Sequence, residues 1–322
     1  MRICTLEIVK AIALLLVGFV FLLKGADFFV DGSSAVAKKL KVPSLIIGLT
    51  IVAMGTSLPE LSVSITASLA NSNALAVSNV IGSNIFNLMV VLGMSALMAV
   101  IEVSDDVTKK DFPFSVVCAV LLLVLGYLGM ELGRIDGAIF LVIFIGFIVY
   151  QVLSALRARK AALSKGDEED EIKLIPMWRA AVYIVGGALA VKFGGDWTVN
   201  GAKTLAAAFG LSENLIGLTI VAMGTSLPEL VTSVVAARKN ELDMAVGNVV
   251  GSNVFNILMI LGVASALSPI GFIMENVIDI CVLLGFSVLV WIFCAAKKKL
   301  GRLEGAVMLL AYAAYAVYIC LR

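Results

Sequence analysis

The sequence contains no histidine, and only 15% of its 322 residues carry a charge. It has five cysteines, none in a C-x-x-C pair: Cys4, Cys118, Cys281, Cys294 and Cys320. Because zinc and copper are held mainly by imidazole and thiolate groups, the sequence argues against a site for either metal. Without a histidine base, a hydrolase that uses Ser57 or Ser226 as nucleophile is a weak interpretation, so we do not expect an enzyme.

Apolar residues make up 61% of the chain, and its mean hydropathy is +1.07. Since about 20 apolar residues in a helix cross a bilayer, the sequence predicts ten membrane-spanning helices: 7–36, 43–69, 75–101, 113–130, 135–156, 177–207, 212–237, 242–267, 273–296 and 302–321. The predicted fold class is an all-α polytopic membrane protein. Its expected partner is the lipid bilayer, and nothing in the sequence indicates nucleic-acid binding or an obligate protein partner.

Lysine and arginine gather in every second connection between these spans, at 37–42, 102–112, 157–176, 238–241 and 297–301. The connections between them hold few basic residues. Because short cytoplasmic loops are enriched in lysine and arginine, we expect the basic connections in the cytoplasm and both termini outside a cell membrane.

A fourteen-residue peptide, GLTIVAMGTSLPEL, occurs at 48–61 and again at 217–230. The same offset of 169 residues (217 − 48) relates NVIGSNIFN at 79–87 to NVVGSNVFN at 248–256. Each half holds five predicted spans, an odd number, so the second copy should enter the membrane with reversed polarity. This is the inverted-repeat design of secondary transporters, whose site lies near the midplane.

The predicted organisation is a first five-helix repeat at 1–156, a charged cytoplasmic linker at 157–176 and a second repeat at 177–322. The linker contains the adjacent acids GDEEDE. A calcium-sensing loop would need spaced ligands and a glycine-assisted turn, so a solvated linker is the simpler interpretation.

The repeated GTSLPE motif places a glycine and a proline near the middle of spans two and seven. Proline removes a backbone donor and frees carbonyl groups, which predicts that both helices are broken. An ionisable residue at this depth costs about 2.5 to 3.5 kcal/mol and is expected to face a cavity and a partner. The polar side chains at the two breaks are Thr56, Ser57, Glu60, Thr225, Ser226 and Glu229.

These groups offer hard oxygen ligands only, which favours calcium, magnesium, sodium or potassium. Calcium accepts about 6 to 8 flexible oxygen ligands, whereas magnesium prefers to keep its waters. In the second motif, Ser83 and Asn87 share a helix face, as do Ser252 and Asn256. Ligation is the favoured interpretation of Asn87 and Asn256, and polar packing between helices is its competitor.

Two alternatives concern the charged residues. Glu60 and Glu229 could instead be buried acids that stabilise helix contacts without touching an ion. Local ion pairs or snorkelling at the membrane ends suffice to explain Lys24, Asp27, Lys192 and Asp196.

Together, the twin GTSLPE and GSN-x-x-N motifs resemble the alpha repeats of the cation/calcium exchanger superfamily, in particular prokaryotic sodium/calcium exchangers, over essentially the whole chain. The resemblance implies a ten-helix fold, calcium and sodium as transported ions, and no cofactor. It implies that Glu60, Glu229, Thr56 and Thr225 surround calcium, and that Ser57, Ser226, Ser83 and Ser252, with the carbonyls of Ala53 and Ala222, help to form sodium sites. Asn87 and Asn256 would complete the cluster.

Some relatives of this superfamily have an aspartate where this chain has Asn256. We therefore do not infer from the resemblance that transport depends on potassium or protons. Two glutamates are neutralised by one calcium or two sodium ions, and an empty site would bury two negative charges, which is costly. We hypothesise that this cost enforces exchange, with spans one and six moving against the bundle. A proton-coupled calcium exchanger and a passive cation channel remain alternatives.

Overall fold

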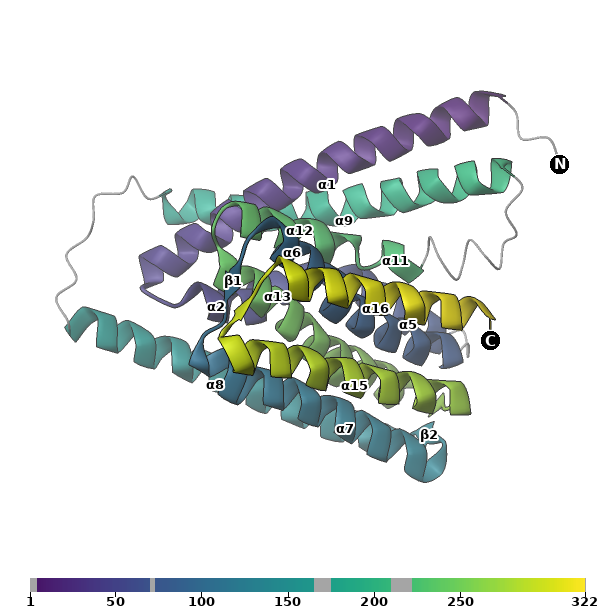
Figure 1. Ribbon diagram of the computed structural model, residues 1–322. Coiled ribbons are helices and arrows are strands. Elements are labelled where there is room, and N and C mark those ends of the chain that lie inside the picture. The colour runs from purple at the N-terminus through teal and green to yellow at the C-terminus, as the bar shows by residue number, and fades with distance from the viewer. Residues whose placement is uncertain (1–4, 70–72, 165–174, 210–221, 322) are drawn as a thin grey trace.

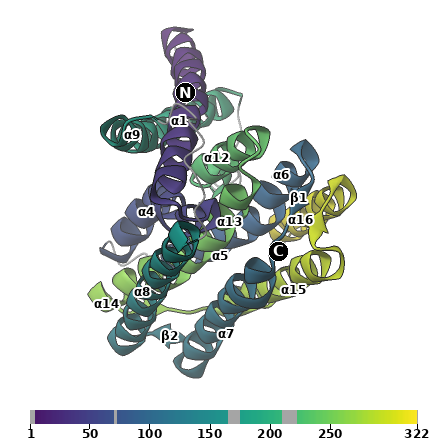
Figure 2. The same ribbon diagram turned by 90° about the vertical axis from the view of Figure 1, so that its left-hand side faces the viewer.

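The computed structural model describes residues 5–69, 73–164, 175–209 and 222–321, and this part of the chain is almost entirely helical (Figure 1). Two long helices, α1 (Thr5–Leu40) and α9 (Met177–Ala208), lie side by side at one edge of the molecule (Figure 2). A Cβ added at Gly194 would lie 2.6 Å from the Leu22 amide nitrogen, and one at Gly25 2.8 Å from that of Val191. Their backbones therefore touch, and we treat the two helices as one packing unit.

The remaining helices of the first half form a chain of long and short segments. They are α2 (Ser44–Ile47), the π-helical η1 (Gly48–Val52), α3 (Ala53–Thr56), α4 (Leu58–Leu69), α5 (Asn73–Phe86), the π-helical η2 (Asn87–Val91), α6 (Leu92–Met98), the π-helical η3 (Val107–Asp111), α7 (Phe112–Gly129) and α8 (Arg134–Ser164). Helix α8 continues eight residues into the segment expected to be the linker, and residues 165–174 lie outside the described part of the chain.

The second half follows a similar order. Its segments are α11 (Ala222–Gly224), α12 (Leu227–Arg238), α13 (Leu242–Phe255), the π-helical η5 (Asn256–Leu261), α14 (Gly262–Leu267), α15 (Met274–Lys297) and α16 (Arg302–Leu321). Four strands of two residues join the halves: β1 (Ile101–Glu102) pairs antiparallel with β4 (Lys299–Leu300), and β2 (Glu131–Leu132) with β3 (Ile270–Gly271). Each strand of the first half therefore pairs with a strand of the second.

The centre of the molecule is formed by the α5–η2 and α13–η5 segments. The apolar windows of these two spans are 78% and 83% buried, against 22 to 33% for the other candidate spans. The other helices expose large apolar side chains such as Val142, Leu310 and Val182. The outer surface is thus suited to lipid, and the polar residues on the two central spans are shielded from it.

Seven helices among the described residues are long and apolar enough to cross a membrane, and the bent pair 44–56 and 58–66 makes an eighth. The bend of 46° falls at the predicted break beside Gly55 and Pro59. Helix α9 has the length of a span but carries four charged residues, and the span predicted at 212–237 begins in a segment outside the described residues. A helical membrane protein is confirmed, whereas ten spans remain a prediction.

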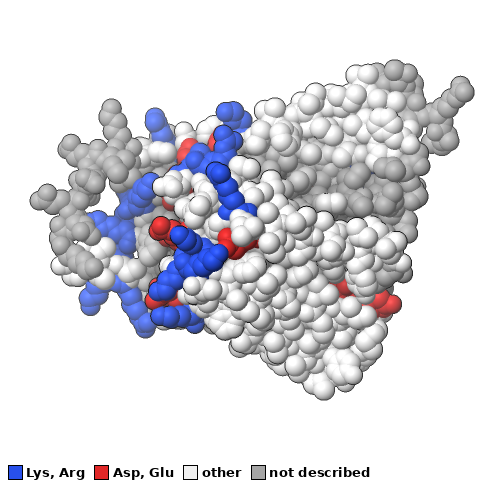
Figure 3. Space-filling model, in the orientation of Figure 1, with Lys and Arg blue, Asp and Glu red and all other residues white. Residues whose placement is uncertain are grey.

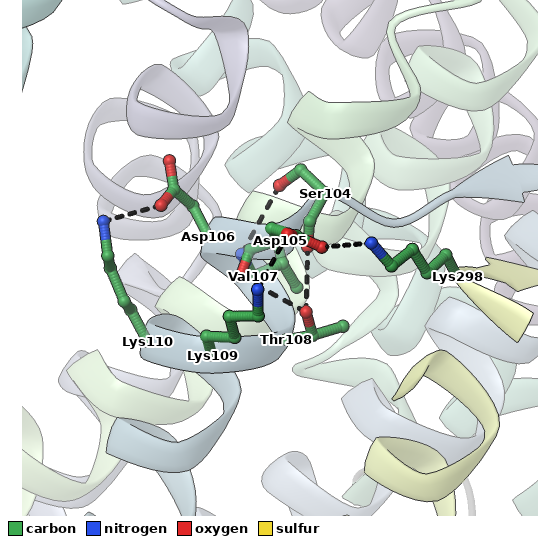
Figure 4. A network of polar contacts seen from close by, with 8 residues as sticks. All are labelled: Ser104, Asp105, Asp106, Val107, Thr108, Lys109, Lys110 and Lys298. Atoms are coloured by element: carbon green, nitrogen blue, oxygen red, sulfur yellow. Dashed lines mark hydrogen bonds and ion pairs between the residues drawn. The ribbon is translucent and has the colours of Figure 1, made fainter. Parts of the chain in front are cut away.

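Lysine and arginine gather at one end of the molecule (Figure 3), where α1 and α8 end, opposite the end where α1 begins and α16 ends (Figure 1). Figure 4 shows ion pairs at this basic end, where Asp105 binds Lys109 at 2.8 Å and Lys298 at 2.7 Å. Hydrogen bonds from these two lysines lower the pKa of Asp105 to about 2. The pair of Asp105 with Lys298 joins the residues before η3 to the residue before β4.

Candidate ion-binding site

Two helix breaks form the frame of the site. Helix α3 ends at Thr56 and α4 begins at Leu58, with Ser57 between them at φ −84° and ψ 13°. The equivalent Ser226 lies between α11 and α12 with φ −92° and ψ 8°. Pro59 and Pro228 stand in the first turn of the following helix, where a missing N–H has no intrahelical partner to lose. The helices therefore restart at the breaks, one residue before each proline.

The two glutamates are held by serines from opposite halves of the chain. The Ser57 hydroxyl donates to Glu229 Oε1 at 2.8 Å, and the Ser226 hydroxyl donates to Glu60 Oε1 at 3.1 Å. Both glutamates are fully buried, with 0% of their surface exposed. Each stands in the first turn of its helix, where the helix dipole favours a negative charge. The predicted convergence of the two acids is therefore present.

Several buried oxygens around these carboxylates have no hydrogen-bond partner within the described residues. They are Glu60 Oε2, Glu229 Oε2, Ser83 Oγ, Ser252 Oγ, Asn87 Oδ1 and Asn256 Oδ1. Buried polar groups are nearly always paired, and an unpaired buried carboxylate oxygen is costly. All six belong to residues that the sequence selected, and a cation that prefers oxygen ligands would satisfy them. Ser33 Oγ, Thr232 Oγ1, Asn253 Oδ1 and the amide nitrogens of Asn87 and Gln151 are also buried and unpaired among the described residues.

Asparagine side chains connect the two central helices. Asn256 Nδ2 donates to Asn84 Oδ1 at 3.0 Å, so the amide nitrogen of Asn256 is occupied while its Oδ1 is not. Asn84 and Asn253 each donate to the backbone carbonyl of the other at 3.2 Å. Asn87 and Asn256 are the first residues of η2 and η5, and such π-helical turns are frequent at functional sites.

Asn84 was not among the predicted site residues. It is the third residue of the repeated GSN motif, and its presence in both copies of the repeat could have marked it as a candidate site residue. Its side chain accepts from Asn256 Nδ2 and so fixes the orientation of the Asn256 amide, whose Oδ1 is unpaired among the described residues.

The two threonines occupy different surroundings. Thr56 is fully buried, and its hydroxyl lies 3.1 Å from both Asn248 Oδ1 and the Val52 carbonyl. Thr225 is partly exposed and lines a cavity of about 160 Å³. The two threonines hold equivalent positions in the repeat, but in the structure Thr56 is buried and Thr225 lines the cavity.

The predicted carbonyl ligands are only partly described. The Ala53 carbonyl accepts from the Ser57 amide at 3.1 Å and from the Thr56 hydroxyl at 3.3 Å. Coordination of an ion by this carbonyl would compete with the Thr56 contact. Ala222 is the first residue of α11, and its side chain lies outside what the structure describes.

The cavity extends from the helix breaks to α9. Pro59, Thr225 and Pro228 form its inner wall, and Lys192 and Asp196 line it from α9. These two charged residues form an ion pair of 3.2 Å four residues apart, as the local-pair interpretation expects. The described residues contain no group of three histidines, cysteines or acids that could hold a metal. The site thus has two buried carboxylates, and the nearby cavity reaches Thr225 and the prolines beside the two breaks.

Known proteins resemble this chain over most of its length. Residues 10–153 and 179–321 match the family described as sodium/calcium exchanger protein. The chain is 38% identical over 314 residues to a putative antiporter, CaxA, of Alkalimonas amylolytica, covering 93% of this chain and 95% of that protein. It is 31% identical to the sodium/calcium exchanger MaX1 of Methanosarcina acetivorans, covering 95% and 97% of the two chains. A solved structure of the sodium–calcium exchanger NCX_Mj, soaked with sodium and strontium, superposes with a TM-score of 0.83 at 32% identity, covering 95% of this chain and 98% of that one.

Proposed function

The chain belongs to the sodium/calcium exchanger family, and we propose that Glu60 and Glu229 form the site at which it exchanges sodium for calcium by alternating access. It is a transporter, and its substrates are the two ions. The observation that carries the site assignment is the pair of fully buried glutamates whose second carboxylate oxygens have no protein partner among the described residues. Because one calcium ion or two sodium ions neutralise the same two charges, either load removes the electrostatic penalty of burial.

The remaining ligands follow from the positions of the repeated motifs. We assign calcium to Glu60, Glu229, Thr56 and Thr225. We assign sodium to Ser57, Ser83, Ser226 and Ser252 with the carbonyls of Ala53 and Ala222, while Asn87 and Asn256 complete the cluster. The unpaired oxygens of Ser83, Ser252, Asn87 and Asn256 support this assignment. Calcium tolerates such a mixed set of oxygen ligands.

We further infer ten membrane spans in two inverted repeats. The crossed bonds from Ser57 to Glu229 and from Ser226 to Glu60 support a twofold relation, since the residues of each bond are exchanged by the 169-residue offset. Residues Asn84 and Asn253, also one offset apart, bond each other reciprocally. The basic end then lies in the cytoplasm and both termini lie outside a cell membrane, with the bilayer as the expected surroundings and no obligate partner or cofactor.

The mechanism proceeds from the charge of the site. A loaded site is neutral or nearly so, and it can be enclosed while α1 and α9 move against the bundle. An empty site buries two carboxylates without a counter-charge, so enclosure without an ion is unfavourable. Transport in one direction therefore requires an ion for the return, which is the condition for exchange rather than leak.

The test is uptake of radioactive calcium into proteoliposomes that are loaded with sodium and diluted into sodium-free buffer. We expect rapid uptake by the parent protein and its loss in Glu229→Gln, which keeps the volume of the side chain and removes its charge. Glu131→Gln, at an exposed position, is the matched control and should transport normally. Uptake driven by a pH difference alone would favour the proton-coupled alternative, and uptake without any counter-gradient would favour a channel.

A further inference from the structure

Helix α1 is fastened at the basic end by the turn between α12 and α13. Lys239 Nζ lies 2.7 Å from Asp31 Oδ1 and 3.3 Å from Asp27 Oδ1, and it donates to the Asp27 carbonyl at 3.0 Å. These contacts join residues more than 200 positions apart in the chain. The local pair predicted between Lys24 and Asp27 is present at 4.0 Å, but the stronger contacts of Asp27 are those to Lys239.

Glu241 makes a second attachment from the same turn. Its carboxylate accepts from the Ser34 hydroxyl and lies 3.2 Å from Lys38 Nζ. The turn is itself well defined, since the Glu241 amide donates to the Ala236 carbonyl at 2.9 Å and Asn240 adopts φ 61°, a conformation that asparagine tolerates. Residues 239–241, which we name the KNE turn, thus present two opposite charges to three charged residues on α1: Asp27, Asp31 and Lys38.

The KNE turn connects the two site helices of the second half. Helix α12 carries Glu229 ten residues before Lys239, and α13 carries Ser252 eleven residues after Glu241. A displacement of α1 away from the bundle at this end must break the attachments to the turn. Breaking them also releases the connection between two ion-binding helices.

The other copy of the repeat lacks these charges. Subtracting 169 from Lys239 and Glu241 gives Ala70 and Ser72, whereas Asn240 maps to another asparagine, Asn71. On the other side of the contact, Asp27 and Asp31 map to Asp196 and Asn200, and both of these α9 residues line the cavity that reaches the helix breaks. The sequence therefore provides an ionic attachment for one end only. The cavity of about 160 Å³ beside the helix breaks is lined by α9 residues away from that attachment, and a separate cavity of about 250 Å³ at the basic end is lined by Leu49, Asp106 and Arg157.

We propose that the KNE turn and its partners on α1 form an ionic gate that closes the basic end of the ion pathway. This inference rests on the alternating access of the proposed function. The gate biases the protein toward the state that is open at the opposite end, because its contacts exist only while α1 lies against the turn. Partly exposed ion pairs each shift an equilibrium by roughly 1.4- to 5-fold, so this gate sets a population without locking the protein.

The gate is tested by thiol labelling of the full chain in a cysteine-free background. Ser62 lines the cavity, and its counterpart in the second repeat is the partly buried Val231 (62 + 169), which we expect at the entrance of the basic end once the gate opens. Ser62→Cys and Val231→Cys therefore serve as reporters of the two entrances, each exposed to a membrane-impermeant maleimide from its own side. Lys239→Gln should accelerate labelling at position 231 about fivefold and slow labelling at position 62, because it removes two ion pairs.

Two further variants separate a gate from general loosening of the structure. Lys192→Gln breaks an ion pair within α9 and should leave labelling at position 231 unchanged. Combining Lys239→Asp with Asp31→Lys should return both labelling rates toward those of the parent. If Lys239→Gln labels at the parent rates, or accelerates both reporters together, the gate does not exist. Because labelling needs no transport, such a result with intact calcium exchange overturns the gate alone, whereas a parent without sodium-driven uptake overturns the proposed function.

Discussion

Replacement of Asn84 by alanine is expected to weaken calcium binding by about 10- to 100-fold, the range typical when a group that orients a ligand is removed. The change removes the acceptor of Asn256 Nδ2 at 3.0 Å and the donor to the Asn253 carbonyl at 3.2 Å. Each buried polar group left without a partner costs roughly 1 to 3 kcal/mol. Without its partner, the Asn256 amide can rotate, and its Oδ1 loses the orientation that we assign to ion binding.

The assay is equilibrium binding of radioactive calcium to purified protein, with thermal unfolding measured in parallel. Asn253→Ala is the matched control: it removes a donor to the Asn84 carbonyl at 3.2 Å, but no hydrogen bond joins its side chain to Asn256 in the described residues. Both variants should unfold at lower temperature, and only Asn84→Ala should lose most of its calcium affinity. Equal calcium affinities in the two variants would refute the positioning role of Asn84.

Two further predictions concern packing and surface charge. A Cβ at Gly187 would lie 2.6 Å from the Phe29 amide nitrogen, whereas one at the adjacent Gly186 would meet nothing within 4 Å. Gly187→Ala should therefore destabilise the protein by about 1 to 3 kcal/mol and Gly186→Ala should not, as thermal unfolding in detergent can measure. The lowered pKa of Asp105 stabilises the folded state above its unfolded value of about 3.9, and this contribution is lost as the pH falls toward about 2. Lys109→Ala should raise the pKa of Asp105, measured by infrared titration of labelled aspartate; an unchanged pKa would contradict the assignment.

The repeat made much of the site predictable. Identical GTSLPE peptides at a fixed offset are enough to locate both helix breaks and both buried glutamates. A proline in the interior of a predicted apolar helix interrupts it, and an ionisable residue within a span is costly unless it faces a cavity or a partner. The crossed pairing of Ser57 with Glu229 is also natural once two copies face each other, although the sequence does not specify which oxygens meet.

Other features of the site depend on the conformation of the whole molecule and cannot be inferred from the repeated motif. Thr56 and Thr225 lie in identical peptides, yet one is fully buried and the other lines a cavity, since a protein with two related halves need not hold both in the same state. The contacts of Lys239 with α1 were equally unforeseen: a basic residue in a loop predicts membrane orientation, but not which distant helix it binds.

The central claim, that one pair of carboxylates serves both ions, is tested most directly by calcium binding to purified protein at increasing sodium concentration. The account predicts one calcium ion per chain, displaced steeply by sodium because more than one sodium ion replaces it, and loss of binding in both Glu60→Gln and Glu229→Gln. Calcium that stays bound at saturating sodium, or that binds normally to either variant, would contradict it.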